Sequence, residues 1–218
     1  MNKIEIFGKN HYQSVRQYLP RMNNNKVDAM KIAKEYGYDY WDGNRQFGYG
    51  GYVYDGRFAS VAESLINQYK LTAKSKVLDF GCGKGYLLFE IKKILNCDVV
   101  GLDISEYAIE HAKPEIKNKI ILGSVDELSR FKLNEFDLVL SNMTLHNLTL
   151  EYFEQSLKEF SRIGKKSLIT MESYRNTQEL FNLQCWALTC NLFFSQEDWQ
   201  YLLGKSNYRG DYELMFFI

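Results

Sequence analysis

One short stretch carries the clearest chemical signal in this chain of 218 residues. An apolar run that begins at Lys76 leads into the sequence Asp79-Phe80-Gly81-Cys82-Gly83-Lys84-Gly85-Tyr86, and apolar residues then recur at helical spacing. This pattern predicts a strand, a glycine-rich turn and a helix. Because glycine has no Cβ and tolerates positive φ, a ligand can approach the backbone of such a turn. The helix behind the turn would add free amide groups and the positive end of its dipole.

The spacing of the glycines narrows the choice of ligand. A dinucleotide-binding turn has the pattern G-x-G-x-x-G and holds a pyrophosphate, whereas the third glycine position is occupied here by Tyr86. Asp79 lies two residues before the first glycine and favours a ligand with a cationic end. Asp103 follows the turn by about twenty residues, the spacing at which an acidic side chain binds ribose hydroxyls. A glycine turn that binds no nucleotide is the alternative interpretation.

These residues resemble the first motif of class I S-adenosylmethionine-dependent methyltransferases. The resemblance implies a Rossmann-like α/β fold with a mostly parallel sheet and helices on both faces. It also implies S-adenosylmethionine as the cofactor. The cofactor contacts that it implies are Asp79, Gly81, Cys82, Gly83, Gly85, Asp103, Ile104, Ser124, Val125, Asp126, Asn142 and Met143.

The resemblance implies a specific role for some of these contacts. Ile104 would lie against the adenine, and Asn142-Met143 would contact the methionine part of the cofactor. Ser124 stands where many related enzymes carry an acid that holds the adenine edge, so Asp126 is a possible substitute. Core packing is the alternative role for Ile104.

Residues 36–57, the aromatic segment, are unusual in composition. They combine glycines with tyrosines, a tryptophan and two arginines, and they resemble an N-terminal stretch of methyltransferases from bacterial surface-polysaccharide (capsule) synthesis. We predict an N-terminal cap or lid over residues 1–58 and a methyltransferase core over residues 59–218. An aromatic cap that only packs over the sheet is the alternative. The predicted substrate contacts, including one residue from the C-terminal region, are Tyr38, Tyr40, Trp41, Arg45, Tyr49, Tyr52, Arg57 and Tyr174.

Strand and helix patterns alternate through the rest of the chain. The predicted strands are 76–80, 98–103, 119–123, 136–141, 167–172 and 212–218. The predicted helices are 26–35, 58–69, 86–94, 105–113, 126–130, 150–163, 176–190 and 195–204. Such alternation predicts a mostly parallel sheet that binds ligands at the carboxyl ends of its strands. We expect the usual closing antiparallel hairpin to be reduced to one strand.

Methyl transfer to a hydroxyl needs a base, whereas transfer to a phosphate or carboxylate oxygen does not. His146 follows the fourth predicted strand on the ligand side and is the first candidate for this base. A histidine that caps the next helix or contacts the cofactor is the alternative. His11 is a second candidate.

Composition excludes several classes of function. The net charge is zero and the pI is about 6.8, so a general basic surface for nucleic acid is not expected. The four cysteines lack metal-ligand spacing and indicate a reducing compartment without a metal site. We find no signal peptide and no apolar run of membrane-spanning length, and therefore expect a cytoplasmic protein with no membrane contact.

The sequence thus predicts an O-methyltransferase for a small polar metabolite. We expect its small-molecule acceptor to be a sugar, or a phosphorylated or phosphoramidate precursor of a capsular or surface polysaccharide. A cofactor-binding partner subunit without catalytic activity is the first alternative. A dinucleotide oxidoreductase is a second, which the glycine spacing disfavours.

Overall fold

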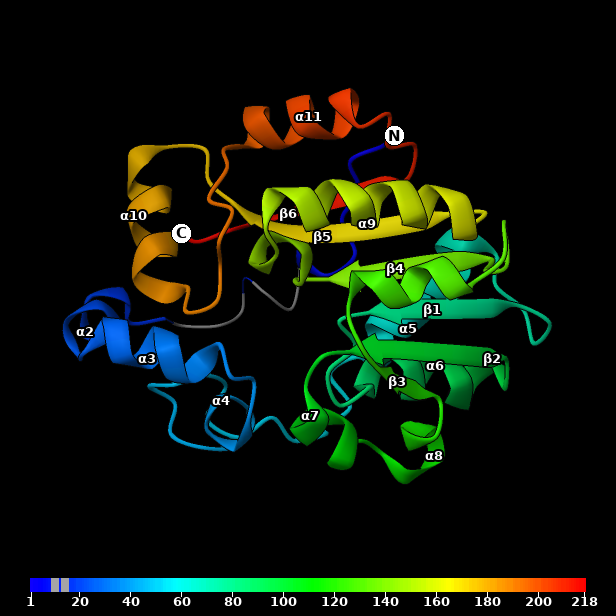
Figure 1. Ribbon diagram of the computed structural model, residues 1–218, viewed down its shortest axis with the longest axis horizontal. Helices are drawn as coiled ribbons and strands as arrows, with labels where there is room; N and C mark the ends of the chain where they lie inside the picture. Colours follow the sequence, from blue (N-terminus) through cyan, green and yellow to red (C-terminus); the bar gives the residue numbers. More distant parts are fainter. Residues whose placement is uncertain (9–11, 13–15) are drawn as a thin grey trace.

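The computed structural model describes residues 1–8, 12 and 16–218, and its strands form one sheet in the order β3-β2-β1-β4-β5-β6 (Figure 1). Neighbouring strands pair in parallel throughout. Apolar runs rich in Val, Leu and Ile form the central strands, as expected for strands buried on both faces. The strands are β1 (Lys76–Phe80), β2 (Asp98–Asp103), β3 (Ile120–Leu122), β4 (Leu138–Asn142), β5 (Ser167–Ser173) and β6 (Asp211–Phe216).

Helices cover both faces of this sheet, which confirms the predicted Rossmann-like fold. α9 and α11 lie on one face and α5 and α6 on the other (Figure 1), and each pair contributes to a separate apolar core. The helices are α2 (Tyr18–Asn23), α3 (Lys26–Ala33), α4 (Tyr38–Trp41), α5 (Ala59–Tyr69), α6 (Tyr86–Leu95), α7 (Glu106–Glu110), α8 (Pro114–Lys117), α9 (Leu150–Ile163), α10 (Thr177–Trp186), α11 (Gln196–Lys205) and the 3₁₀ helices η1 (Val125–Arg130) and η2 (Leu145–Asn147).

Two predicted helices end well before the predicted residue in the structure, whereas the bounds of the other predicted helices differ by at most two residues. The predicted helix 105–113 ends at Glu110, and Pro114 begins α8. Proline fits the first turn of a helix because the amide there has no intrahelical partner. The predicted helix 176–190 ends at Trp186, and the extended chain that follows it lines a cavity.

The sheet closes with one C-terminal strand, as predicted. This strand, β6, runs parallel to β5, with Leu168 opposite Asp211 and Ser173 opposite Phe216. α10 and α11 lie between the two strands in sequence. A crossover of this length permits parallel pairing, whereas a hairpin would force antiparallel pairing.

The first residues of the chain pack against this edge of the sheet. Ile4 donates its amide hydrogen to the carbonyl oxygen of Tyr212, and the amides of Ile6, Phe7 and Gly8 donate to the carboxylate of Glu213. Residues before the aromatic segment therefore contact the core directly. The boundary at residue 58 between cap and core stays a prediction.

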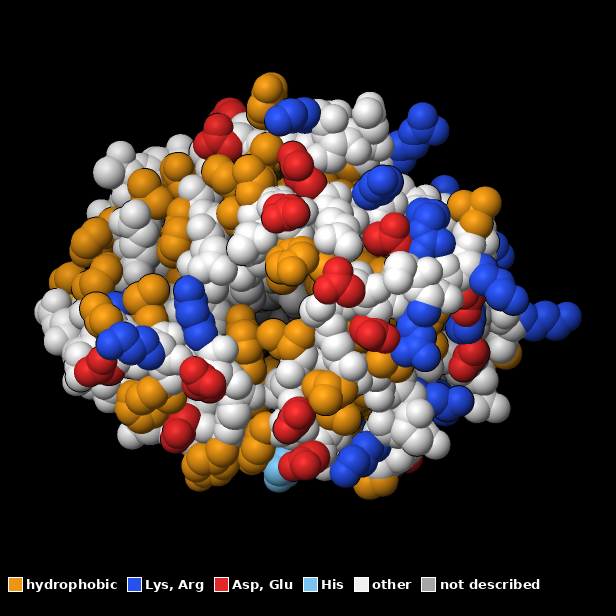
Figure 2. Space-filling model, viewed as in Figure 1, with side chains coloured by type: hydrophobic (Ala, Val, Ile, Leu, Met, Phe, Trp, Pro, Cys, Tyr) orange, Lys and Arg blue, Asp and Glu red, His pale blue; other side chains and the backbone are white. Residues whose placement is uncertain are grey.

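α2, α3, α4 and α10 lie beyond the carboxyl ends of the strands, which point toward them in Figure 1. Viewed from the same side as in Figure 1, the molecular surface has a hollow near its centre with hydrophobic side chains around it (Figure 2). Within the described ranges, no helix is both long and apolar enough to cross a bilayer. The end of the parallel sheet at which such folds bind ligands thus faces these four helices.

Candidate active site

The glycine turn adopts the backbone that its sequence predicts. Gly81, Gly83 and Gly85 have φ values of 77°, 56° and 70°, a region that other residues rarely adopt. A Cβ on Gly81 would lie 2.2 Å from the Thr144 side chain, and one on Gly83 would lie 2.7 Å from the Trp41 ring. Glycine is required here both by the backbone conformation and by close packing of the chain itself.

The amide groups of the turn are less available than predicted. Those of Gly81 and Cys82 donate to the carbonyl oxygen of Leu102, at 2.7 and 3.3 Å, and that of Gly85 donates to the carbonyl oxygen of Cys82. The amide of Gly83 donates to Asp103 Oδ2 at 2.6 Å. A bound pyrophosphate needs free amides in such a turn. The dinucleotide interpretation therefore loses further support.

Asp103 joins the turn to the end of β2. Its second oxygen, Oδ1, accepts a hydrogen bond from the amide of Ser105 at 2.9 Å. Burial raises the pKa of Asp103, and the amides of Ser105 and Gly83 oppose that rise. Each oxygen keeps acceptor capacity beyond these bonds, so the carboxylate could also bind the hydroxyls of a ribose.

Asp103 lines the smaller of two cavities, with a volume of about 200 Å³. Ile104, Ser124 and Val125 lie on the same wall, so the structure brings these predicted adenosine contacts together. Asp126 is exposed and does not line the cavity; Gln155 Nε2 lies 3.5 Å from its Oδ1. The polar side chain near the predicted adenine edge is therefore Ser124.

Asp79 supplies a second carboxylate beside the glycine turn, in the lining of the larger of the two cavities. It is 3% exposed, and its Oδ1 has no hydrogen-bond partner among the described residues. Burial, followed by repulsion from Asp103, raises the pKa of Asp79 to about 7. A buried, unpaired carboxylate is costly, and the ammonium group of S-adenosylmethionine could pair with it. The carboxylates of Asp79 and Asp103 therefore fit the ammonium group and the ribose of this cofactor.

The larger cavity has a volume of about 360 Å³ and shares Gly81, Asn142 and Met143 with the smaller one. Tyr38 and Tyr174 lie outside this lining: Tyr38 is 58% exposed and packs on Tyr107, and Tyr174 packs in a separate apolar cluster. Predicted cofactor residues Asp79, Cys82 and Gly83 also line the cavity. The predicted substrate residues in the lining are Tyr40, Trp41, Arg45, Tyr49, Tyr52 and Arg57.

The lining of the larger cavity also contains charged and aromatic residues that the sequence analysis did not predict as site residues. Arg16, Arg21, Glu172 and Trp186 come from separate parts of the chain, and no motif links them. Glu172 ends a predicted strand on the ligand side, which is a signal that could have identified it. The two arginines precede the predicted helix at Lys26 without any pattern of their own.

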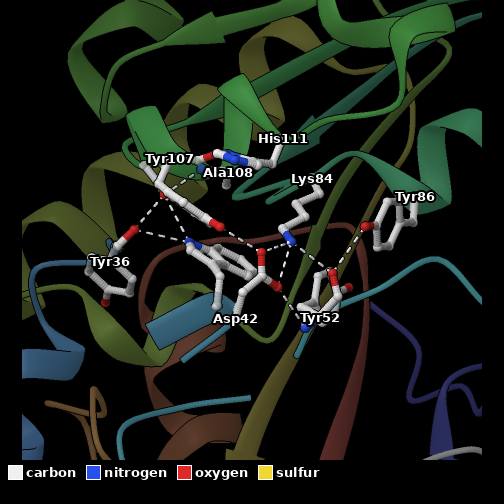
Figure 3. Close-up of polar contacts among 10 residues, drawn as sticks. Tyr36, Asp42, Tyr52, Lys84, Tyr86, Tyr107, Ala108 and His111 are labelled. Carbon is white, nitrogen blue, oxygen red and sulfur yellow. Dashed lines mark hydrogen bonds and ion pairs between the residues drawn. The ribbon is translucent and has the colours of Figure 1, made fainter. Parts of the chain in front are cut away.

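A buried ion pair fixes the aromatic segment to the glycine turn (Figure 3). Lys84 Nζ lies 2.6 Å from Asp42 Oδ2, and the Lys84 side chain is 4% exposed. Asp42 also accepts hydrogen bonds from the Tyr107 hydroxyl and the Tyr52 amide, at 2.8 and 3.0 Å. The Tyr52 carbonyl oxygen accepts from Lys84 and from the Tyr86 hydroxyl. Each charged atom of the pair thus has a hydrogen-bond partner besides the other member of the pair.

The aromatic rings extend this contact over the turn. Trp41 Nε1 donates to Ser105 Oγ at 2.8 Å, and its ring stacks on Tyr49 with centroids 5.3 Å apart. Trp41, Tyr40 and Tyr49 line both cavities. The aromatic segment therefore forms a wall of each cavity in addition to packing over the sheet.

His146 is buried in the lining of the larger cavity. Its Nδ1 accepts a hydrogen bond from the amide of Glu172 at 3.3 Å, so the ring proton belongs on Nε2, which lies 3.5 Å from Glu172 Oε2. Burial lowers the pKa of His146 to about 3 and keeps the ring neutral. The other histidine candidate, His11, lies outside the described residues. Among the described residues, no group of three His, Cys, Asp or Glu side chains could hold a metal ion.

Known proteins share this sequence pattern and this fold. A family model described as a methyltransferase domain matches residues 71–208, more than half of the chain. The fold is similar to that of a SAM dependent methyltransferase from Archaeoglobus fulgidus, with a TM-score of 0.54, 20% identity and 69% of each chain covered. The chain therefore belongs to the class I S-adenosylmethionine-dependent methyltransferase domain family.

Two curated relatives match a part of the chain. The mitochondrial arginine-hydroxylase NDUFAF5 of Homo sapiens is 31% identical over 113 residues, which cover 50% of this chain and 31% of that protein. A malonyl-acyl-carrier-protein O-methyltransferase of Bacillus cereus is 29% identical over 124 residues, 56% of this chain and 46% of that protein. The chain thus matches less than half the length of either relative, and their different activities do not define its own.

The ion pair between Lys84 and Asp42 gives a stability prediction. We expect Lys84→Met to lower the free energy of unfolding by about 3 kcal/mol, because it leaves a largely buried carboxylate without its cation. Urea unfolding followed by circular dichroism measures the change. The control is Lys31→Met, which removes an exposed pair with Asp28 and should change the value by less than about 0.5 kcal/mol. Equal effects of the two variants would contradict a structural role for the buried pair.

The raised pKa of Asp79 predicts that cofactor binding depends on pH. Below pH 7 the carboxyl group is mostly protonated, so it cannot attract an ammonium group. We expect the affinity for S-adenosylhomocysteine to rise about tenfold from pH 6 to pH 8, as measured by titration calorimetry. Asp79→Asn should abolish this rise and weaken binding at pH 8. Glu172→Gln should retain it, and a flat profile in the unaltered protein would exclude the assignment.

Proposed function

We propose that the protein methylates an oxygen atom of a small polar metabolite, with S-adenosylmethionine as the methyl donor. The observation that carries this proposal is the wall shared by the two cavities. Because Gly81, Asn142 and Met143 line both, a ligand in the smaller cavity would meet a ligand in the larger one there. Such an arrangement suits the transfer of a group between two bound molecules.

The larger cavity supports a small acceptor with polar groups. Its volume lies in the lower part of the range for small-molecule sites, and its lining combines tyrosine rings with arginines and Glu172. We propose a sugar, or a phosphorylated or phosphoramidate precursor of a capsular or surface polysaccharide. The resemblance of the aromatic segment to methyltransferases of surface-polysaccharide synthesis supports this choice.

The chain's own residues would mainly position the reactants and exclude water. Bound S-adenosylmethionine supplies an activated methyl group, so little covalent chemistry is left to the protein. In this proposal Asp103 binds the ribose and Asp79 pairs with the ammonium group, while Trp41 and Tyr49 close the site against solvent. Alignment of the acceptor oxygen then supplies most of the rate enhancement.

Glu172 is the group best placed to remove a proton from an acceptor hydroxyl. Its carboxylate lines the larger cavity, and its Oε2 has no hydrogen bond among the described residues. Burial raises the pKa of Glu172 to about 7, and Arg16, Lys26 and Arg21 oppose this rise. A base with a pKa near 7 suits proton abstraction at neutral pH. His146, whose accepting nitrogen is already occupied, would instead hold Glu172 in position.

The alternative is a cofactor-binding partner subunit without catalytic activity. Such a protein would need the smaller cavity and the part of the larger cavity beside the glycine turn, where Asp79 lies, but no space for an acceptor. The larger cavity beside Asn142 and Met143, with an ionisable group in it, favours the enzyme.

A screen of acceptors tests the proposed activity. The protein is incubated with S-adenosylmethionine and a panel of sugars, nucleotide sugars and phosphorylated metabolites, and release of S-adenosylhomocysteine is measured. We expect at least one acceptor to increase release above the level seen without acceptor. Calorimetry with S-adenosylhomocysteine runs in parallel as a check of the cofactor site. Cofactor binding without turnover of any acceptor would favour the inactive partner subunit.

Substitution of Glu172 tests the assignment of the base. With an acceptor from this screen, Glu172→Gln should lower kcat by about 10² to 10⁴-fold, because no carboxylate remains to take the proton. The variant should also lose the rise of kcat with pH near 7. His146→Asn should lower kcat less and shift that pH profile, as expected of a positioning residue. Full activity of Glu172→Gln would show that the acceptor oxygen is already ionised and that no base is needed.

A further inference from the structure

Three guanidinium groups surround one indole ring on a wall of the larger cavity. The Cζ atoms of Arg21, Arg45 and Arg16 lie 4.5, 4.9 and 5.5 Å from the centroid of the Trp186 ring. The arginines come from the last turn of α2, from the aromatic segment and from the chain before α2, while Trp186 ends α10. All four residues line the cavity. The fold thus gathers positive charge from three separate segments.

The hydrogen bonds of Arg21 and Arg45 do not neutralise this charge. Arg21 donates to the carbonyl oxygen of Arg45 at 3.0 Å, and Arg45 donates to the carbonyl oxygens of Gly48 and Tyr49 at 2.7 and 3.0 Å. Within residues 1–8, 12 and 16–218, neither arginine forms an ion pair with a carboxylate. Arg21 Nε is buried and has no partner in the same described part of the chain. A donor is therefore left for a ligand.

A neighbouring lysine adds to the excess of positive charge around Trp186. Lys26 Nζ donates to the carbonyl oxygen of Cys185, so it adds a further cation beside the cluster. Burial, followed by repulsion from Arg45, lowers the pKa of Arg21 to about 10, and burial with repulsion from Arg21 lowers the pKa of Lys26 to about 8. Glu172 is the carboxylate that attracts Arg21 and Lys26. One buried acid cannot balance this group of cations.

We propose that Arg21, Arg45 and Trp186 form a binding site for a phosphate group of the acceptor, a proposal that rests on the function proposed above. Guanidinium groups bind phosphate oxygens through paired, charge-assisted hydrogen bonds. A phosphate dianion matches the excess positive charge better than a carboxylate, which carries one negative charge. Arg57 also lines the cavity but is already paired with Asp55, at 2.6 Å between Nη2 and Oδ2. The phosphate therefore binds at the Trp186 wall, and the atom to be methylated lies nearer to Glu172.

Direct binding of inorganic phosphate tests this site without any methyl transfer. Titration calorimetry on the full chain should show phosphate binding, and acetate at the same ionic strength should bind at least tenfold more weakly. Arg21→Gln should weaken phosphate binding at least tenfold, while Arg21→Lys should retain part of the affinity. Arg130→Gln, which removes an exposed arginine that lines neither cavity, is the matched control and should bind phosphate as the unaltered protein does.

Binding of S-adenosylhomocysteine to each variant is measured in parallel. Unchanged affinity in Arg21→Gln shows that the variant is folded and that only the phosphate site is altered. Phosphate that binds equally well to Arg21→Gln, or acetate that binds as tightly as phosphate, would overturn the proposed site while the methyltransferase function stands. If the unaltered protein does not bind S-adenosylhomocysteine, the proposed function itself is contradicted. The two failures are therefore distinguishable.

Discussion

The buried ion pair between Lys84 and Asp42 is the contact on which the rest of the site depends. Lys84 lies within the glycine turn, and Asp42 lies in the aromatic segment, so one pair joins the core to the wall that covers it. Buried charges are costly unless they are paired and hydrogen-bonded. Additional bonds from Tyr107 and Tyr52 meet that requirement. The aromatic segment is thereby held in one position over the turn.

This arrangement separates acidic from basic side chains around the two adjoining cavities. Asp79 and Asp103 lie on the side of the glycine turn, whereas Arg21 and Arg45 lie on the wall formed with Trp186. The shared residues between the cavities are mostly uncharged. A cationic cofactor and an anionic acceptor would each be attracted to its own side. This separation of charge would orient the two ligands with respect to each other before reaction.

Much of the core could be predicted from local patterns. Apolar runs and the proline and glycine positions identify the strands, and the spacing of Gly81, Gly83 and Gly85 indicates the ligand class. The direction of β6 could not be predicted, because it depends on the path of α10 and α11 rather than on the strand's own residues. Asp126 lies outside the lining of the smaller cavity, because a short 3₁₀ helix exposes its side chain, and no periodicity reveals that.

By itself, the sequence determined the fold class and the cofactor, because the residues of the glycine motif lie at fixed distances from one turn. Only the tertiary structure shows which residues line the larger cavity. Arg21, Glu172 and Trp186 are far apart in the chain and share no motif, and they meet because separate elements converge at the carboxyl ends of the strands. Local spacing carries information about neighbours in the chain, whereas a cavity is defined by contacts between distant segments.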